Sequence, residues 1–224
     1  AGNPNNGKTT MYNALTGRSE KVGNWAGVTV DKKESNIKKN YYDIEEEVIA
    51  VDLPGAYSMS PFTSEESVTS TYVKSTNLDA IINIVDATNL SRSLFFTTQL
   101  MELGVPVVVA LNKSDINEKK DTEINVELLS KKLGCPVIET VSIANNNNGL
   151  KELVNKAISL KDQVQKAPYD QGNVDLGNKE AVKEADKKRY AFINQIVKEV
   201  EKRKVFTKDK NYQDKIDAVL TNRW

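Results

Sequence analysis

The 224-residue chain has no histidine and only one cysteine, Cys135. The lack of histidine excludes imidazole general bases and most zinc sites. A lone cysteine forms no internal disulfide, which fits a reducing compartment, and we expect it to be a small buried residue. Long apolar runs are also missing. The longest aliphatic stretch, 105–111, contains a proline and is far shorter than the roughly 20 residues that cross a bilayer.

An excess of charge of either sign is absent as well, since 31 Lys and Arg residues balance 31 Asp and Glu residues. A balanced chain has no global field that would attract nucleic acid, and we expect no nucleic-acid partner. The balance is uneven along the chain, because residues 1–160 carry 16 positive and 20 negative charges and residues 161–224 carry 15 and 11. The 39% of hydrophobic residues is ordinary for a soluble protein with a buried core.

Short β-branched runs alternate with longer helical patterns over most of the chain. This alternation predicts an α/β fold of three layers, with helices on both faces of a mostly parallel sheet. Apolar residues at helical spacing near the C-terminus predict a further all-α region. The expected strands are 47–52, 80–86, 105–112 and 136–141, with 28–39 as a polar edge strand, and the expected helices are 8–16, 65–74, 93–103, 126–133 and 150–160.

The segment GNPNNGKT, from Gly2 to Thr9, matches the phosphate-loop pattern G-x-x-x-x-G-K-[ST] at every fixed position. Its backbone N–H groups and the following helix N-terminus would bind phosphate oxygens. Lys8 would reach the β- and γ-phosphates, and the Thr9 hydroxyl would bind Mg²⁺. The predicted nucleotide-binding residues of this loop are Gly2, Asn3, Pro4, Asn5, Asn6, Gly7, Lys8, Thr9 and Thr10. Such a loop needs a strand in front of it, so we expect the natural chain to start before Ala1.

A D-x-x-G motif, Asp52-Leu53-Pro54-Gly55, ends the expected strand 47–52. Its position would present Asp52 to the Mg²⁺ shell, and the Gly55 N–H would contact the γ-phosphate. Loss of that phosphate would then release the loop, as in a nucleotide switch.

A second motif, Asn112-Lys113-Ser114-Asp115, ends the expected strand 105–112 and predicts guanine selectivity. The Asp115 carboxylate can accept two hydrogen bonds from the N1–H and 2-amino groups of guanine, a pair that adenine does not offer. Asn112 would support the purine edge, and the stem of Lys113 would cover its face. After strand 136–141, the backbone of Val141, Ser142 and Ile143 lies where an N–H would meet guanine O6, with a register open by about one residue.

The segment Gly23-Asn24-Trp25-Ala26-Gly27-Val28-Thr29-Val30 resembles the first switch of FeoB proteins, which are bacterial ferrous-iron transporters. GNPNNGKTTMYNALTG, DLPGAYS and IVDATNLSRSLFFTTQLMELGVPVVVALNK resemble the same family, so that the likeness covers residues 1–160. It implies a Ras-like P-loop GTPase domain in which Thr29 closes on Mg²⁺ and the γ-phosphate, with Gly27 and Val28 beside the nucleotide. The residues expected to act in hydrolysis are Asn5, Lys8, Thr29 and Gly55.

Two departures from Ras-like GTPases bear on the reaction. Ala56 follows the D-x-x-G motif, where a glutamine would orient the attacking water, and the only arginines in residues 1–160, Arg18 and Arg92, are outside both switches. GTPases that resemble this chain use K⁺ to meet the transition-state charge. The resemblance implies K⁺ ligands at Asn5 and at the backbone of Gly23 and Trp25.

By the same resemblance, residues 1–160 form a GTP- and GDP-binding domain, and residues 161–224 form a helical domain that leads to a transmembrane domain of the same protein. The expected location is the cytoplasmic face of the bacterial inner membrane, with Trp224 projecting away from the nucleotide site. One alternative is a soluble K⁺-dependent GTPase of ribosome assembly or tRNA modification, although no RNA-binding motif follows residue 160. A second alternative is a nucleotide-binding regulatory module with negligible turnover.

Overall fold

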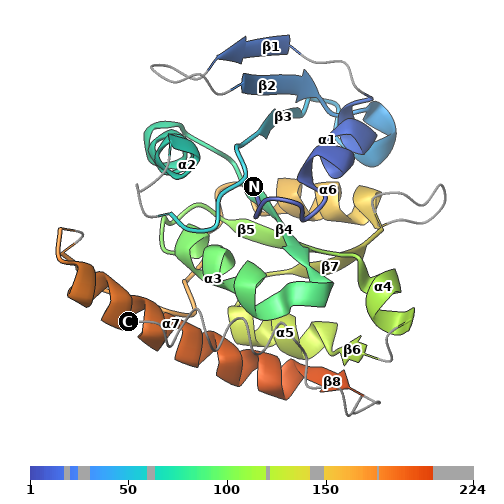
Figure 1. Ribbon diagram of the computed structural model, residues 1–224. Helices are drawn as coiled ribbons and strands as arrows, with labels where there is room; N and C mark the ends of the chain where they lie inside the picture. The colour runs from blue at the N-terminus through green and yellow to red at the C-terminus, as the bar shows by residue number, and fades with distance from the viewer. Residues whose placement is uncertain are drawn as a thin grey trace.

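The computed structural model describes residues 1–17, 21–24, 31–59, 64–119, 122–141, 149–175 and 177–203. These residues form an α/β core with helices on two faces, and a long C-terminal helix lies across one of them (Figure 1). The described helices are α1 (Lys8–Thr16), α2 (Ser64–Ser75), α3 (Leu90–Met101), α4 (Ser114–Lys119), α5 (Val126–Leu133), α6 (Leu150–Ser159) and α7 (Lys179–Val200). The described strands are β1 (Lys21–Asn24), β2 (Asp31–Asn36), β3 (Ile49–Asp52), β4 (Ile81–Asp86), β5 (Val107–Asn112), β6 (Thr122–Ile124), β7 (Val137–Thr140) and β8 (Glu201–Arg203).

The central sheet is parallel, in the order β4-β5-β7, and its register pairs Asp86 of β4 with Asn112 of β5. The order β1-β2-β3 forms a second, antiparallel sheet beside it. In β5, successive residues face opposite sides, as the strand period of two requires. Val107, Val109 and Leu111 pack with α3, α5 and α7, whereas Val108 and Ala110 pack with α1 and α6. The predicted three-layer arrangement is therefore confirmed.

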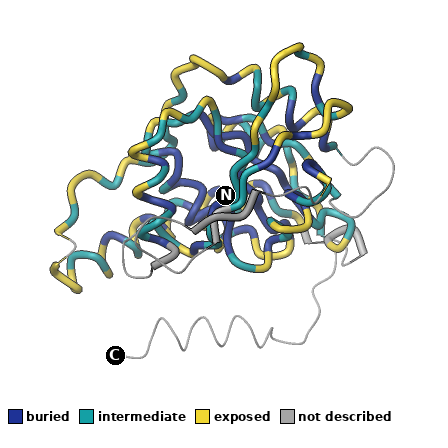
Figure 2. The backbone as a smooth tube through the Cα atoms, turned by 90° about the horizontal axis from the view of Figure 1, so that it is seen from above, coloured by how far each residue is buried: buried dark blue, intermediate teal, exposed yellow. Residues whose placement is uncertain are grey.

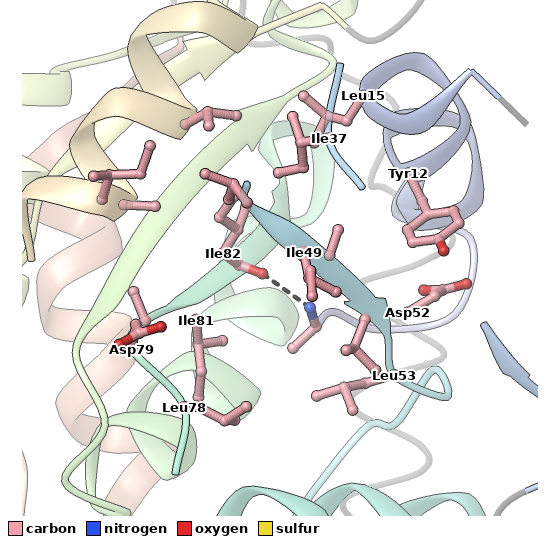
Figure 3. Close-up of a pocket in the computed structure, with 18 of the residues that line it drawn as sticks. Tyr12, Leu15, Ile37, Ile49, Asp52, Leu53, Leu78, Asp79, Ile81 and Ile82 are labelled. Carbon is pink, nitrogen blue, oxygen red and sulfur yellow. Dashed lines mark hydrogen bonds between the residues drawn. The ribbon is translucent and has the colours of Figure 1, made fainter. Parts of the chain in front are cut away.

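A cleft of about 650 Å³ separates β3 from β4, between the two sheets. Figure 3 shows Ile49 and Leu53 on one side of it and Ile81 and Ile82 on the other. The first residues of the chain enter this cleft: the Ala1 nitrogen donates to Ile82 O at 2.9 Å. Ile84 N donates in turn to Ala1 O at 2.9 Å, and Gly2 forms a parallel bridge with Ile84. The chain thus enters the phosphate loop along the free edge of β4.

The C-terminal helix α7 shares the hydrophobic core of the α/β part, since Ile193, Ile196 and Val200 belong to the same buried cluster as α3 and α5. Tyr190 stacks on Phe95 of α3, with ring centroids 4.5 Å apart. After α7, β8 pairs antiparallel with β6. Figure 2 shows buried backbone concentrated at the centre of the molecule and exposed backbone at its periphery. The division of the chain at residue 160 stays a prediction, and the expected helical pattern around 212–219 lies outside the described residues.

Candidate functional site

The phosphate loop runs from Gly2 to the start of α1 beside the carboxyl ends of β3, β4 and β5. Its shape depends on residues with positive φ: Gly2 (155°), Asn5 (66°) and Gly7 (91°). A Cβ on Gly2 would lie 2.9 Å from Ile84 O, so the close approach of this loop to β4 requires glycine. The loop then leads into α1, whose N-terminal N–H groups form an environment suited to phosphate.

Lys8 and Asp52 bring the phosphate loop and the D-x-x-G motif together. The Lys8 ammonium donates to Asp52 Oδ1 at 3.0 Å, and the two side chains are only 15% and 11% exposed. Gly55, three residues further on, packs against Pro4, and a Cβ at position 55 would meet three Pro4 atoms at 3.3 Å. A cation and a carboxylate thus share a half-buried position beside the loop, which is the chemistry needed for a phosphate and its divalent cation.

Asn6 fixes the back of the phosphate loop. Its side-chain amide donates to Ile84 O at 3.0 Å and to the Ser93 hydroxyl of α3 at 3.2 Å. The Asn112 amide donates to the backbone oxygen of Asn6 at 2.9 Å. Asn112 therefore connects the guanine-recognition motif to the loop, in addition to the purine contact that we predict for it. Asn3 is also buried, and its amide atoms have no hydrogen-bond partner among the described residues.

Lys113 connects the same two segments on their solvent side. The backbone φ of Lys113 is 66°. Its ammonium donates to Asn5 O at 2.9 Å and to Asp86 Oδ2 at 2.5 Å. Asp115 follows in the first turn of α4 and is half-buried. The carboxylate proposed to select guanine thus lies next to the lysine that is anchored on the phosphate loop.

The remaining predicted site residues divide into two sets. Asn5, Thr9 and Thr10 are exposed, Val141 follows β7 and is half-buried, and Gly23 lies in β1 opposite Lys32. The others lie outside the described residues: Trp25, Gly27, Val28, Thr29, Ser142 and Ile143. The first-switch threonine and most of the predicted O6 loop therefore stay predictions.

The residue directly after the D-x-x-G motif is Ala56, whose methyl group cannot orient a water. Ala56 is 2% exposed, and its N–H donates to Gly2 O at 3.4 Å. Arg92 lies over the Tyr57 ring, 4.1 Å from its centroid. Met59 N donates to the Gln99 amide oxygen of α3 at 2.9 Å, so that this segment is attached to the same helix as Asn6.

Sequence reasoning did not identify Asp86 and Ser93 as parts of this region. Ser93 joins Asn6 and also accepts from Asp86 N at 3.2 Å. Asp86 ends β4, as Asp52 ends β3 and Asn112 ends β5. A polar residue at the carboxyl end of a predicted parallel strand was the available signal for Asp86, because ligands bind at that edge of such sheets.

The part of the chain that the structure describes contains no helix long and apolar enough to span a membrane. No group of three or more His, Cys, Asp or Glu side chains that could hold a metal ion occurs among the described residues. A Mg²⁺ site of the kind predicted here needs only one carboxylate, with the phosphates and waters as further ligands, so it does not depend on such a group.

Comparison with known proteins gives a consistent picture. The profile of the family described as "Ferrous iron transport protein B" matches residues 1–157. The Fe(2+) transporters FeoB of Salmonella typhimurium and Escherichia coli K12 are each 49% identical to the chain over 145 residues, which are 63% of this chain and 18% of the relative. The chain thus aligns with less than a fifth of the length of these relatives.

Solved structures with the same fold include the cytosolic domain of L. pneumophila FeoB, at 31% identity and a TM-score of 0.78, covering 90% of this chain and 98% of that one. The cytosolic domain of T. maritima FeoB in GMPPNP form has 25% identity and a TM-score of 0.76, covering 90% and 97%. A GDP-bound mutant of the S. thermophilus domain has 31% identity and a TM-score of 0.74, covering 90% and 97%. These findings, together with the phosphate loop and its two partner motifs, establish that the chain belongs to the FeoB family and forms its N-terminal P-loop GTPase domain.

Proposed function

We propose that this chain binds GTP and GDP, hydrolyses GTP, and acts as the cytosolic switch of a ferrous-iron transporter. One observation carries the proposal: Lys8 pairs with Asp52, and Lys113 bonds to Asn5 O, so that the motifs at the ends of β3 and β5 both meet the phosphate loop. The relatives support the nucleotide, since T. maritima FeoB is described in GMPPNP and GDP forms and the S. thermophilus domain is described bound to GDP.

Different residues of the chain bind the phosphates and the base of the nucleotide. The loop N–H groups and Lys8 hold the phosphates, and Asp115 accepts hydrogen bonds from the N1–H and 2-amino groups of guanine. The Gly55 N–H contacts the γ-phosphate, so that hydrolysis frees the D-x-x-G loop. Because Met59 N donates to the Gln99 side chain of α3, release of this loop would break or strain a contact with α3.

The residues present fit the two expected cations. Thr9 and Asp52 provide a hydroxyl and a carboxylate, the oxygen ligands that Mg²⁺ prefers, and Thr29 is the proposed third protein ligand. Mg²⁺ would neutralise phosphate charge when bound. Asn5 is exposed on the phosphate loop, and with the backbone of Gly23 and Trp25 it would provide neutral oxygens suited to K⁺. K⁺ would supply the positive charge that an arginine supplies in other GTPases.

The test is GTP turnover in K⁺ and in Na⁺ at equal ionic strength. We expect faster turnover in K⁺ by at least tenfold, since one positive charge at the transition state can be worth several powers of ten. The stimulation should disappear in Asn5→Ala while GDP affinity is kept. Equal turnover in both salts, or full stimulation in Asn5→Ala, would refute the cation site. No turnover in either salt would support a regulatory nucleotide-binding module instead.

The function in transport rests on the family alone. The proposal places residues 161–224 between the nucleotide-binding domain and a transmembrane domain, at the cytoplasmic face of the inner membrane. The expected outward direction of Trp224 lies outside the described residues. In the complete protein, ferrous iron uptake into vesicles should be lost in Lys8→Ala, because this variant cannot bind the β- and γ-phosphates. Uptake at the unchanged rate would separate transport from GTP binding.

A further inference from the structure

Asp86 is a buried carboxylate at the end of β4 that is hydrogen-bonded at both oxygens, although it belongs to none of the predicted nucleotide-binding motifs. The residue is 7% exposed. One oxygen, Oδ1, accepts from Thr88 N at 2.9 Å and from the Thr88 hydroxyl at 2.6 Å. The other, Oδ2, accepts from the Lys113 ammonium at 2.5 Å. A buried carboxylate persists only with such compensation, because its desolvation is otherwise costly.

The hydrogen bonds of the two Asp86 carboxylate oxygens have different structural roles. The Oδ1 bonds close a short turn and cap the 3₁₀ segment Ala87–Asn89, which is a local structural role. The Oδ2 bond reaches 27 residues along the chain to Lys113, whose ammonium also bonds to Asn5 O. A free lysine side chain has many rotamers, and fixing it costs conformational entropy. Two acceptors at once, one of them a carboxylate whose orientation Thr88 fixes, hold the Lys113 ammonium at the phosphate loop.

Lys113 lies between Asn5 of the phosphate loop, to which its ammonium bonds, and Asp115 of the guanine-recognition motif. Asn5, on the phosphate loop, has a φ of 66°, and Lys113 has the same φ. Both residues adopt the left-handed region, which non-glycine residues visit at a cost. The ion pair offsets this cost at Lys113, which directly precedes α4 and lies two residues before Asp115. Asp86 is thus bonded to the lysine that connects the phosphate loop with the guanine-recognition motif.

We propose that Asp86 is a positioning residue for guanine-nucleotide binding, acting through Lys113 to hold the base-recognition motif against the phosphate loop. The inference rests on the proposed function, since the nucleotide is guanine-specific only if Asp115 acts as described. Asp86 itself contacts Thr88 and Lys113 rather than the nucleotide. Its loss should therefore shorten the lifetime of the complex without changing which base is bound.

The variant Asp86→Asn tests the Oδ2 bond. An amide keeps an oxygen for Thr88 but turns an NH₂ group toward the Lys113 ammonium, so that the charge-assisted bond is lost. We expect GDP to dissociate about 10- to 100-fold faster, on the scale of a lost hydrogen bond to a charged group. The readout is stopped-flow release of a fluorescent GDP, with thermal unfolding measured in parallel. The matched control is Asp79→Asn, since Asp79 pairs with Lys161 at 3.5 Å and both side chains are more than half exposed.

A double-mutant cycle with Lys113→Ala separates positioning from a merely structural role. If Asp86 acts through Lys113, the double variant should release GDP at the rate of Lys113→Ala alone. Multiplied effects in the double variant, or an Asp86→Asn variant that releases GDP at the wild-type rate, would overturn the proposal. Should Asp86→Asn fail to fold, Thr88→Ala keeps the charge and removes one orienting donor, and an unchanged release rate in that variant would also overturn it.

If the proposed guanine-nucleotide binding were wrong, a different set of results would be expected. In that case the wild-type protein would not bind GDP, or Asp115→Asn would bind it normally. With those two controls behaving as expected, a negative result at position 86 refutes only the role of Asp86.

Discussion

At the scale of single residues, the charged groups of the site are held by partners that come from distant parts of the chain. The motifs predicted Lys8, Asp52 and Lys113 as site residues, because their spacing is distinctive. The motifs did not predict Asp86, the carboxylate partner of Lys113. The bond from Lys113 to Asp86 depends on the register of β4 against β5, which places residues 86 and 112 side by side. A single aspartate at the end of a strand is a weaker signal in the sequence than a motif with fixed spacing.

Cys135 illustrates a residue whose behaviour follows from burial alone. It is 4% exposed, and burial raises the pKa of its thiol to about 12. The thiolate is the reactive form, so we expect no reaction with a thiol reagent near neutral pH until the protein unfolds. Rapid labelling of the native protein would contradict the buried position.

The same thiol predicts a pH dependence of stability. The unfolded thiol ionises near pH 9.0 and the folded thiol near pH 12, so between these values the folded state binds more protons. Stability contributed by Cys135 is therefore complete below pH 9 and is lost as pH rises toward 12, by at most about 1.4 kcal/mol per pH unit. Urea unfolding of the wild type and of Cys135→Ala should converge over this range. A constant difference would mean that the thiol ionises equally in both states.

At the scale of elements, local signals decided which predictions matched the structure. Helices α1 and α5 have the predicted bounds, because glycines with positive φ follow both: Gly17 (78°) and Gly134 (69°). The strands β1, β6 and β8 were not predicted. They are short, and β6 depends on pairing with β8, which lies about 80 residues further along. No local pattern reports such a pairing.

Arg189 is the main polar contact between α7 and α3. It is 3% exposed and donates to the Thr98 hydroxyl at 3.1 Å and to Glu102 Oε2 at 2.6 Å. Replacing it with methionine keeps much of the volume but leaves Glu102 without its cation, so Arg189→Met should lower the free energy of unfolding by about 2–4 kcal/mol. Urea denaturation measures this. Lys187→Met is the control, since its ion pair with Glu184 is more than half exposed and should change stability by less than about 1 kcal/mol.

The cleft between β3 and β4 predicts an element that pairs with both strands. Ala1 and Gly2 follow the edge of β4 as a parallel strand would, while the expected strand in front of the phosphate loop stays a prediction. Five further residues of valine and isoleucine before Ala1 should fill the cleft and raise the melting temperature by several degrees, because each buried apolar side chain contributes about 1.5–3 kcal/mol before its ordering cost. A Gly-Ser extension of equal length is the control. Equal melting temperatures would show that the cleft does not accept a strand.

At the scale of the whole molecule, α3 is the element that connects the other parts. It meets the phosphate loop through Ser93 and the segment after the D-x-x-G motif through Gln99, and α7 through Thr98 and Glu102. The sequence predicted the layers, since these depend on periodicity, and its motifs name residues that lie together in the structure, although their role in binding stays a prediction. It could not predict this connecting role, which arises from long-range contacts between helices.

Selection of guanine through the Asp115 carboxylate can be measured by titration calorimetry with GDP. We expect wild-type protein to bind GDP and not ADP. Asp115→Asn should weaken GDP binding by about 2–4 kcal/mol, because two buried donors lose their acceptor and face a new donor. The same variant should gain affinity for xanthosine diphosphate, whose C2 oxygen accepts from the new amide. Near-normal GDP affinity in Asp115→Asn, or equal binding of ADP and GDP by the wild type, would contradict the account.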